Sequence, residues 1–168
     1  MELAGGSITA LVGGNGSGKT TLARMIAGYL TPYRGKMKWH RPVPDVSVAY
    51  LPANPAYLFI DAPFDGSGGE REWHGIDLVL SKEADLYILD EPTKGLDPVK
   101  KAELIDRLQK KKQQAKSILL VTHDIEFAAT AADTMAMMYD GKVAACEEKE
   151  RFLRENVFYT TELQRLLS

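Results

Sequence analysis

The amino-acid sequence predicts an α/β fold in which helices flank a mainly parallel sheet. Two observations support this prediction. Short apolar segments that favour β-structure alternate along the chain with longer segments of helical spacing. Glycines or acidic residues directly follow two of the apolar segments, which is typical of the carboxyl edge of a parallel sheet, where ligands bind. The 168 residues provide for one domain with one core.

The predicted strands are short apolar runs bounded by polar or glycine residues. They cover residues 8–12, 46–51, 86–89 and 118–121. Residues 135–138 and 142–145 are expected to form a hairpin, because Asp140-Gly141 between them is a favoured two-residue turn. We also expect an edge strand at residues 36–39.

The predicted helices are segments in which apolar residues recur at helical spacing. They cover residues 20–30, 70–81, 99–116, 125–132 and most of 147–168. Gly28 and Pro32 mark the end of the first helix. The run Lys110-Lys111-Lys112 is interpreted as a solvated helix face rather than a nucleic-acid site.

Composition narrows the function classes. The balance of 21 Lys+Arg against 23 Asp+Glu argues against nucleic acid or an anionic membrane as the main partner. The single cysteine, Cys146, excludes an internal disulfide and a metal site of several thiolates. Apolar stretches are too short to span a bilayer, and no signal-peptide pattern is present. We expect a cytosolic protein, or one that reaches a membrane only by docking to a partner.

The first chemical motif follows the first predicted strand and precedes a helix. It reads Gly13-Gly14-Asn15-Gly16-Ser17-Gly18-Lys19-Thr20 and matches the phosphate-binding P-loop pattern. Its glycines let successive backbone N–H groups turn toward an anion, and the helix N-terminus adds a positive dipole end. Lys19 would contact the β- and γ-phosphates of ATP, and the Thr20 hydroxyl would bind Mg²⁺. The other reading is a glycine-rich turn that fits the pattern by chance.

The second and third motifs lie at the ends of two later strands. Asp90 and Glu91 follow the apolar run 86–89. Asp90 would hold Mg²⁺, and Glu91 would orient or deprotonate the attacking water. His123 follows the run 118–121, where its side chain could reach a γ-phosphate. Taken singly, the acidic pair could be an ordinary loop, and the histidine is more often structural.

The order and spacing of these motifs resemble the nucleotide-binding domain of an ABC ATPase, a P-loop NTPase with a RecA-like core. Gly13 to Thr20 match Walker A, 86–91 match Walker B with the catalytic glutamate, Gly95-Leu96-Asp97 match the D-loop, and His123 matches the switch histidine. The resemblance implies ATP and Mg²⁺ as ligands, with Glu91 and His123 as catalytic residues and with Thr20 and Asp90 at the metal. The implied nucleotide contacts are Gly13, Asn15, Gly16, Ser17, Gly18, Lys19, Thr20 and Thr21, together with Ser67, Gly68 and Gly69.

A finer resemblance is to the ATPases of energy-coupling-factor importers, which take up vitamins and transition metals. The segments that support it are 50–55, 90–97 and the tail 158–167. It implies a homodimer or a heterodimer with another ABC ATPase, docked on transmembrane subunits at the cytoplasmic face of the membrane.

The sequence departs from the family at four places. Ala53 stands where the family has the glutamine of the Q-loop, and alanine has no polar group to contact Mg²⁺ or water. The signature motif appears as Gly66-Ser67-Gly68-Gly69-Glu70, with Gly66 in place of leucine. Residues 1–168 are expected to form a single core, with the helical subdomain reduced to a short connection around 54–81. The antiparallel strands that normally precede Walker A, with their adenine-stacking aromatic residue, are expected to be missing.

Two explanations of the shortened sequence and three functions remain open. The shortening is either natural or engineered, with Gly66 to Gly69 then also serving as a flexible splice. The leading function is an importer ATPase that hydrolyses ATP at a head-to-tail dimer interface. The alternatives are a non-catalytic or engineered minimal nucleotide-binding module and a chromosome-maintenance ATPase head. The lack of a basic face argues against the last.

Overall fold

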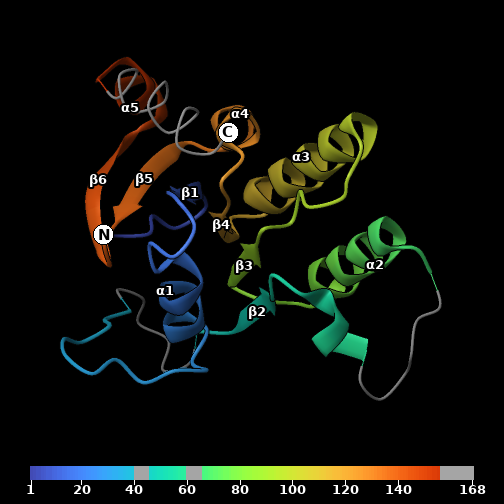
Figure 1. Cartoon of the computed structure of the whole chain (residues 1–168), viewed down its shortest axis with the longest axis horizontal. Helices are drawn as coiled ribbons and strands as arrows, with labels where there is room; N and C mark the ends of the chain where they lie inside the picture. Colours follow the sequence, from blue (N-terminus) through green and yellow to red (C-terminus); the bar gives the residue numbers. More distant parts are fainter. Residues whose placement is uncertain (40–45, 60–65, 156–168) are drawn as a thin grey trace.

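A six-stranded sheet forms the centre of the molecule (Figure 1). The computed structural model describes residues 1–39, 46–59 and 66–155. The strands are β1 (Ile8–Val12), β2 (Val48–Leu51), β3 (Leu86–Asp90), β4 (Ser117–Val121), β5 (Thr134–Tyr139) and β6 (Lys142–Glu148). They lie in the order β2-β3-β4-β1-β5-β6, and only β6 is antiparallel to its neighbour. The predicted fold class, a mainly parallel sheet flanked by helices, is confirmed.

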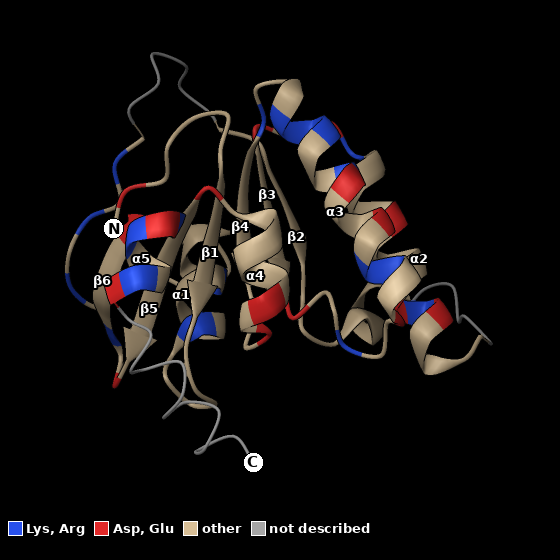
Figure 2. Ribbon diagram, turned by 90° about the horizontal axis from the view of Figure 1, so that it is seen from above, with Lys and Arg blue, Asp and Glu red and all other residues tan. Residues whose placement is uncertain are grey.

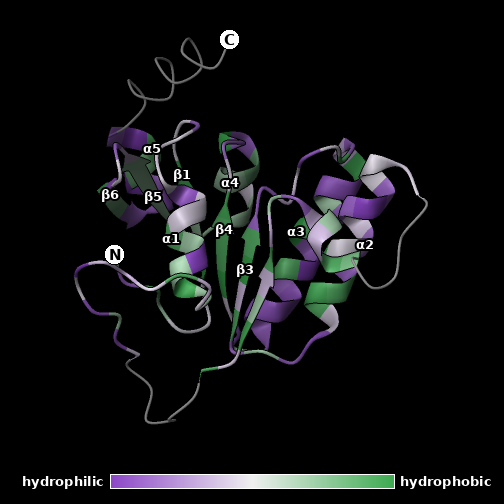
Figure 3. Ribbon diagram, turned by 60° about the horizontal axis from the view of Figure 1, so that its bottom comes forward, coloured by the Kyte–Doolittle hydropathy of each residue, from purple (hydrophilic) through white to green (hydrophobic). Residues whose placement is uncertain are grey.

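Helices cover both faces of the sheet. They are α1 (Lys19–Ile26), the 3₁₀-helix η1 (Pro55–Phe59), α2 (Gly68–Ser81), α3 (Pro98–Gln113), α4 (Ile125–Ala131) and α5 (Lys149–Glu155). Helix α1 packs on one face, with Ala23 and Ile26 beside Leu11. Helices α2 to α5 pack on the other face (Figures 1 and 3). Because successive side chains of a strand point to opposite faces, the fully buried strands supply both cores.

The predicted hairpin is confirmed. Strands β5 and β6 pair in antiparallel fashion around Asp140 and Gly141, whose φ angles are 47° and 72°. Two positive φ angles in a row are the requirement of a type I′ turn, which suits the Asp-Gly sequence.

Several predicted boundaries and one predicted strand were wrong. The first helix ends at Ile26 rather than residue 30, because Gly28 adopts a φ of 82° and its N–H bonds back to the Met25 carbonyl. Residues 147 and 148 belong to β6 instead of a helix. The edge strand expected at residues 36–39 does not form.

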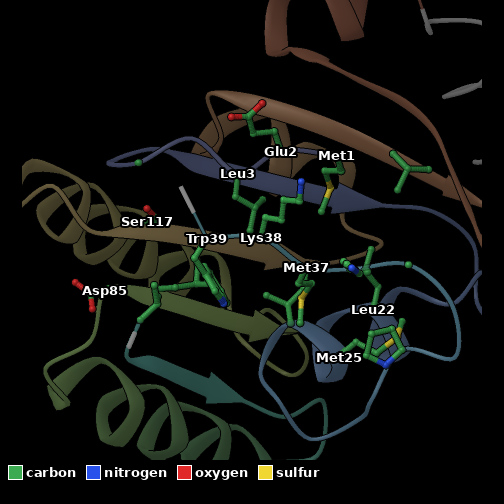
Figure 4. Close-up of a pocket in the computed structure, with 18 of the residues that line it drawn as sticks. Met1, Glu2, Leu3, Leu22, Met25, Met37, Lys38, Trp39, Asp85 and Ser117 are labelled. Atoms are coloured by element: carbon green, nitrogen blue, oxygen red, sulfur yellow. The ribbon is translucent and has the colours of Figure 1, made fainter. Parts of the chain in front are cut away.

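Residues 36–39 instead border a hollow of about 970 Å³ on the α1 face (Figure 4). Met37 and Trp39 line it together with Leu22 and Met25 of α1. Asp85, which precedes β3, also lines it, so the hollow opens near the amino ends of the strands. None of the P-loop residues Gly13 to Thr20 lines this hollow, which therefore lies away from the predicted phosphate site.

Charged residues of both signs are mixed along α2 and α3 (Figure 2). Two lysines of the run 110–112 have partners within the fold. Lys111 Nζ donates to the Tyr87 hydroxyl at 3.0 Å, and Lys112 pairs with Asp133. Within the described residues, no helix combines the length and apolar character that crossing a lipid bilayer requires. His40 and the tail 158–167 lie outside the described residues.

Candidate functional site

Three neighbouring strands deliver the predicted chemical groups to one edge of the sheet. Strand β4 lies between β1 and β3, and all three run parallel. The parallel ladder continues past the strands, because the N–H of Thr122 donates to the Leu11 carbonyl at 3.1 Å and the N–H of Glu91 donates to the Val121 carbonyl at 2.7 Å. The P-loop, the acidic pair and the loop of His123 therefore begin side by side.

The P-loop adopts a conformation that requires glycine. Gly16 and Gly18 have φ angles of 76° and 101°, which side chains rarely adopt. Gly13 has a φ of 152°, and a Cβ there would collide with the carbonyl oxygen of Met138. The hairpin turn supports the loop from the side, because the N–H of Gly141 donates to the Ser17 carbonyl at 3.0 Å. Sequence reasoning missed this support by β5 and its turn.

Lys19 lies inside this loop. Its side chain is buried, and Nζ donates to the carbonyls of Gly13 at 2.8 Å and Gly14 at 3.0 Å. Burial lowers the pKa of Lys19, while the nearby Glu91 and Asp90 carboxylates oppose that shift. The lysine is thus held at the centre of the loop, facing the acidic pair, where a cation can meet phosphate oxygens.

Asp90 and Thr20 provide a donor set that suits Mg²⁺. Asp90 is fully buried, and its Oδ1 atom accepts no hydrogen bond from the described residues. Burial raises the pKa of Asp90, although hydrogen bonds from Thr20 and Tyr50 and the charge of Lys19 act in the opposite direction. Carboxylate and hydroxyl oxygens are ligands that Mg²⁺ accepts, with phosphates and water completing the shell. Among the described residues no group of three or more His, Cys, Asp or Glu side chains could hold a metal by itself.

Glu91 and His123 form a contact pair beside this site. Glu91 Oε2 lies 2.7 Å from His123 Nδ1, and it also accepts from the Thr122 hydroxyl at 3.4 Å. The Glu91 side chain is 17% exposed and that of His123 is 51% exposed, so the pair lies at the boundary between protein and solvent. Glu91 has a φ of 53°, a strained conformation for a residue with a side chain, which is typical of functional sites.

The three residues of the signature motif, Ser67, Gly68 and Gly69, lie at the start of α2. Ser67 caps α2, with its Oγ accepting from Glu70 N at 3.4 Å and its N–H donating to Glu70 Oε2 at 2.8 Å. This capping box lowers the pKa of Glu70. Helix α2 packs on the face of the sheet opposite α1 (Figure 1). The fold therefore does not bring Ser67, Gly68 and Gly69 to the P-loop of the same chain.

The remaining predicted contacts of the P-loop differ in their exposure. Asn15, Gly16 and Thr21 are exposed, whereas Ser17 is buried and its Oγ has no hydrogen-bond partner within the described residues. Sequence reasoning missed Tyr50, whose hydroxyl donates to Asp90 Oδ2 at 3.4 Å. The available signal was its place on a strand that leads to the same edge of the sheet.

Comparison with known proteins agrees with this geometry. The family model for ABC transporters matches residues 1–65. A Bacillus thuringiensis protein whose name describes an ABC transporter ATP-binding protein is 32% identical over 208 residues, covering 96% of this chain and 38% of the relative. A Pyrococcus horikoshii protein of the same description is 30% identical, covering 80% of this chain and 70% of the relative. The energy-coupling factor transporter ATP-binding protein EcfA2 of Methanospirillum hungatei is 30% identical, covering 83% of this chain and 48% of the relative.

Solved structures share the fold. The ATP-binding subunit of an ABC transporter superposes with a TM-score of 0.79 at 23% identity, covering 99% of this chain and 90% of that chain. The chain spans 38% of the length of the Bacillus relative. The Pyrococcus relative, by contrast, is matched over more than two thirds of its length, and the P-loop, acidic pair and histidine meet as the sequence motifs require. The chain therefore belongs to the ABC transporter ATP-binding family.

Proposed function

We propose that this chain is an ATP-binding subunit of an ABC importer and that it hydrolyses Mg·ATP at the edge of its sheet. The observation that supports this best is the convergence of Lys19, Asp90 and the Glu91–His123 pair at the ends of three adjacent strands. The four side chains supply the cation, the metal ligand and the proton acceptor that phosphoryl transfer needs.

Nucleotide binding would begin at Lys19. Its Nζ would exchange the carbonyls of Gly13 and Gly14 for phosphate oxygens, so the lysine remains hydrogen-bonded in both states. Helix α1 begins at Lys19, and its first N–H groups point toward the same anion. Thr20 and Asp90 would hold Mg²⁺, which would neutralise phosphate charge.

Hydrolysis would depend on Glu91 and His123. The Glu91 carboxylate would orient the attacking water and accept its proton, and His123 Nδ1 would hold that carboxylate in place at 2.7 Å. The strained backbone of Glu91 fixes the direction of its side chain before substrate binds.

A complete site would need two chains. Because Ser67, Gly68 and Gly69 lie across the sheet from α1, they would serve nucleotide bound to a partner chain in a head-to-tail dimer. The partner would be a second copy or another ABC ATPase. Residues 1–168 would act as one core domain, in which residues 54–81 form the short connection that replaces a larger subdomain.

The importer type rests on the resemblance of residues 50–55 and 90–97 and on the similarity to EcfA2. The transported compound would be a vitamin or a metal. The assembled complex would work at the cytoplasmic face of the cell membrane, with the chain held there by transmembrane subunits.

A second candidate is a non-catalytic nucleotide-binding module. Ala53 favours it, because a methyl group provides no polar atom at the position from which the family contacts metal and water. In that case the chain would bind Mg·ATP as a switch or scaffold.

One titration tests both candidates. Mg·ATP would be titrated into the chain while bound nucleotide, released phosphate and oligomeric mass are recorded together. We expect Lys19→Met to lose nucleotide binding, and Glu91→Gln to keep binding but lose phosphate release. Unchanged turnover in Glu91→Gln would remove the role given to Glu91. Binding without any turnover in the parent chain would favour the module.

A further inference from the structure

Tyr50 lies beside the proposed metal-binding carboxylate. It stands on β2, paired in register with Ile88 of β3, and Asp90 ends that neighbouring strand. The Tyr50 hydroxyl donates to Asp90 Oδ2 at 3.4 Å in a partly buried setting. This distance is long for an O–H···O bond, as is common for catalytic hydrogen bonds before substrate binds.

The direction of this hydrogen bond follows from its two partners. A carboxylate can only accept, so the single hydroxyl hydrogen of Tyr50 points to Asp90. Burial raises the pKa of Tyr50, and the nearby Arg24 guanidinium of α1 acts in the opposite direction. The Tyr50 ring also packs against Tyr29, with ring centroids 5.5 Å apart.

The two oxygens of Asp90 are consequently unequal. Oδ2 accepts from Tyr50, whereas Oδ1 is buried with no hydrogen-bond partner among the described residues. We propose that Tyr50 is a positioning residue for the metal site: it holds Oδ2 and thereby turns Oδ1 toward Mg²⁺. This inference rests on the proposed function, because it needs Asp90 to bind the metal of Mg·ATP.

Tyr50→Phe tests the inference, since it removes the hydroxyl and keeps the ring. Mn²⁺ serves as a spectroscopically visible substitute for Mg²⁺, and free Mn²⁺ is measured by electron paramagnetic resonance with a saturating non-hydrolysable ATP analogue. We expect Tyr50→Phe to bind Mn²⁺ about tenfold more weakly, because this is the size of effect that losing a hydrogen bond to a charged group produces. Affinity for the analogue in EDTA should stay unchanged, because Tyr50 does not act on phosphate.

Tyr29→Phe is the matched control. It makes the same chemical change in the ring that packs against Tyr50, at a side chain that is 70% exposed. Metal affinity should equal that of the parent chain. Asp90→Asn should weaken Mn²⁺ binding more than Tyr50→Phe does, and adding Tyr50→Phe to it should weaken binding no further, because Tyr50 acts through the Asp90 carboxylate.

Several results would overturn the inference. Mn²⁺ affinity within twofold of the parent in Tyr50→Phe would do so, as would an equal loss in Tyr29→Phe. If Tyr50→Phe does not fold, an unchanged Mn²⁺ affinity in Tyr50→Leu would have the same force. A further outcome is that the analogue binds in EDTA while Asp90→Asn leaves the Mn²⁺ affinity unchanged. That outcome would refute the inference, but nucleotide binding by the chain would still stand. No analogue binding at all would refute the proposed function, and this inference with it.

Discussion

Glu72 shows how one residue can make stability depend on pH. This side chain of α2 is only 5% exposed, and its Oε1 atom has no hydrogen-bond partner within the described part of the chain. Burial raises its pKa to about 7, and the charge of Lys94 offsets only part of that shift. The folded state therefore holds a proton on Glu72 under conditions in which an unfolded chain has released it.

Glu72→Gln should remove this pH dependence. Because the folded-state pKa lies above the unfolded value of 4.5, the parent chain loses stability as pH rises from about 4.5 through about 7. We expect the variant to be more stable than the parent by on the order of 2 kcal/mol at pH 8, and to differ little at pH 5. Urea unfolding at both pH values measures the difference. Glu148 is exposed, so Glu148→Gln serves as the control and should show no pH-dependent gain in stability. An equal gain in stability at both pH values in Glu72→Gln would contradict the raised pKa of Glu72.

At the scale of elements, Trp73 links α2 to α3. Lys100 Nζ lies 4.1 Å and Arg107 Cζ lies 4.6 Å from the centroid of its ring, and Arg107 also pairs with Asp77 of α2. Two cations over one ring hold the helix of the signature residues against the helix that follows the D-loop.

Trp73→Leu should lower the free energy of unfolding by about 1–2 kcal/mol, because the apolar volume is mostly kept while both cation–π contacts are lost. Equilibrium unfolding in urea measures this value. The same substitution made in an Arg107→Met background should cost less, since one contact is already absent. Equal costs in both backgrounds would show that the ring acts only by its apolar area.

Elements were predictable where short-range chemistry decides them. The P-loop, the Asp-Gly turn and the buried strands follow from glycine conformation and apolar runs. Residues 36–39 were mispredicted because Met37 and Trp39 have strand-like composition, yet they border the hollow on the α1 face, largely exposed and without a strand partner. Residues 147 and 148 were mispredicted because pairing with β5 outweighs their helix-favouring sequence.

The convergence of the motif residues in the candidate site was predictable, but the side chains that surround them were not. Lys19 follows from the P-loop pattern, and Asp90, Glu91 and His123 follow from their places at or just after strand ends. Tyr50 could not be assigned, because its contact with Asp90 depends on β2 and β3 being neighbours in the sheet.

At the scale of the whole molecule, Gly68 allows the proposed dimerisation to be tested separately from folding. A Cβ at Gly68 would meet no atom within 4 Å, whereas one at Gly69 would lie 2.9 Å from the Gly95 carbonyl oxygen. Among the described residues nothing fills the space beside Gly68, and in the proposed dimer a partner chain would fill it.

Gly68→Ala should leave the stability of the chain and its single-site ATP affinity unchanged, and should reduce ATP-dependent dimerisation at least several-fold. Sedimentation velocity with Mg·ATP in a Glu91→Gln background measures the dimer. Gly5→Ala, which also has open space around its Cβ, is the matched control and should dimerise like the parent. An intact dimer in Gly68→Ala would place the interface elsewhere.

The continuation of the ladder beyond β3 and β4 has a consequence for amide hydrogen exchange. The N–H groups of Glu91 and Thr122 belong to loops, yet they bond to the carbonyls of Val121 and Leu11 inside the sheet. Their deuterium uptake should be as slow as that of core strand amides, because exchange would require the sheet itself to open. The exposed Asn15 amide at the same edge should exchange quickly. Rapid exchange at Glu91 would mean that the acidic pair moves independently of the sheet.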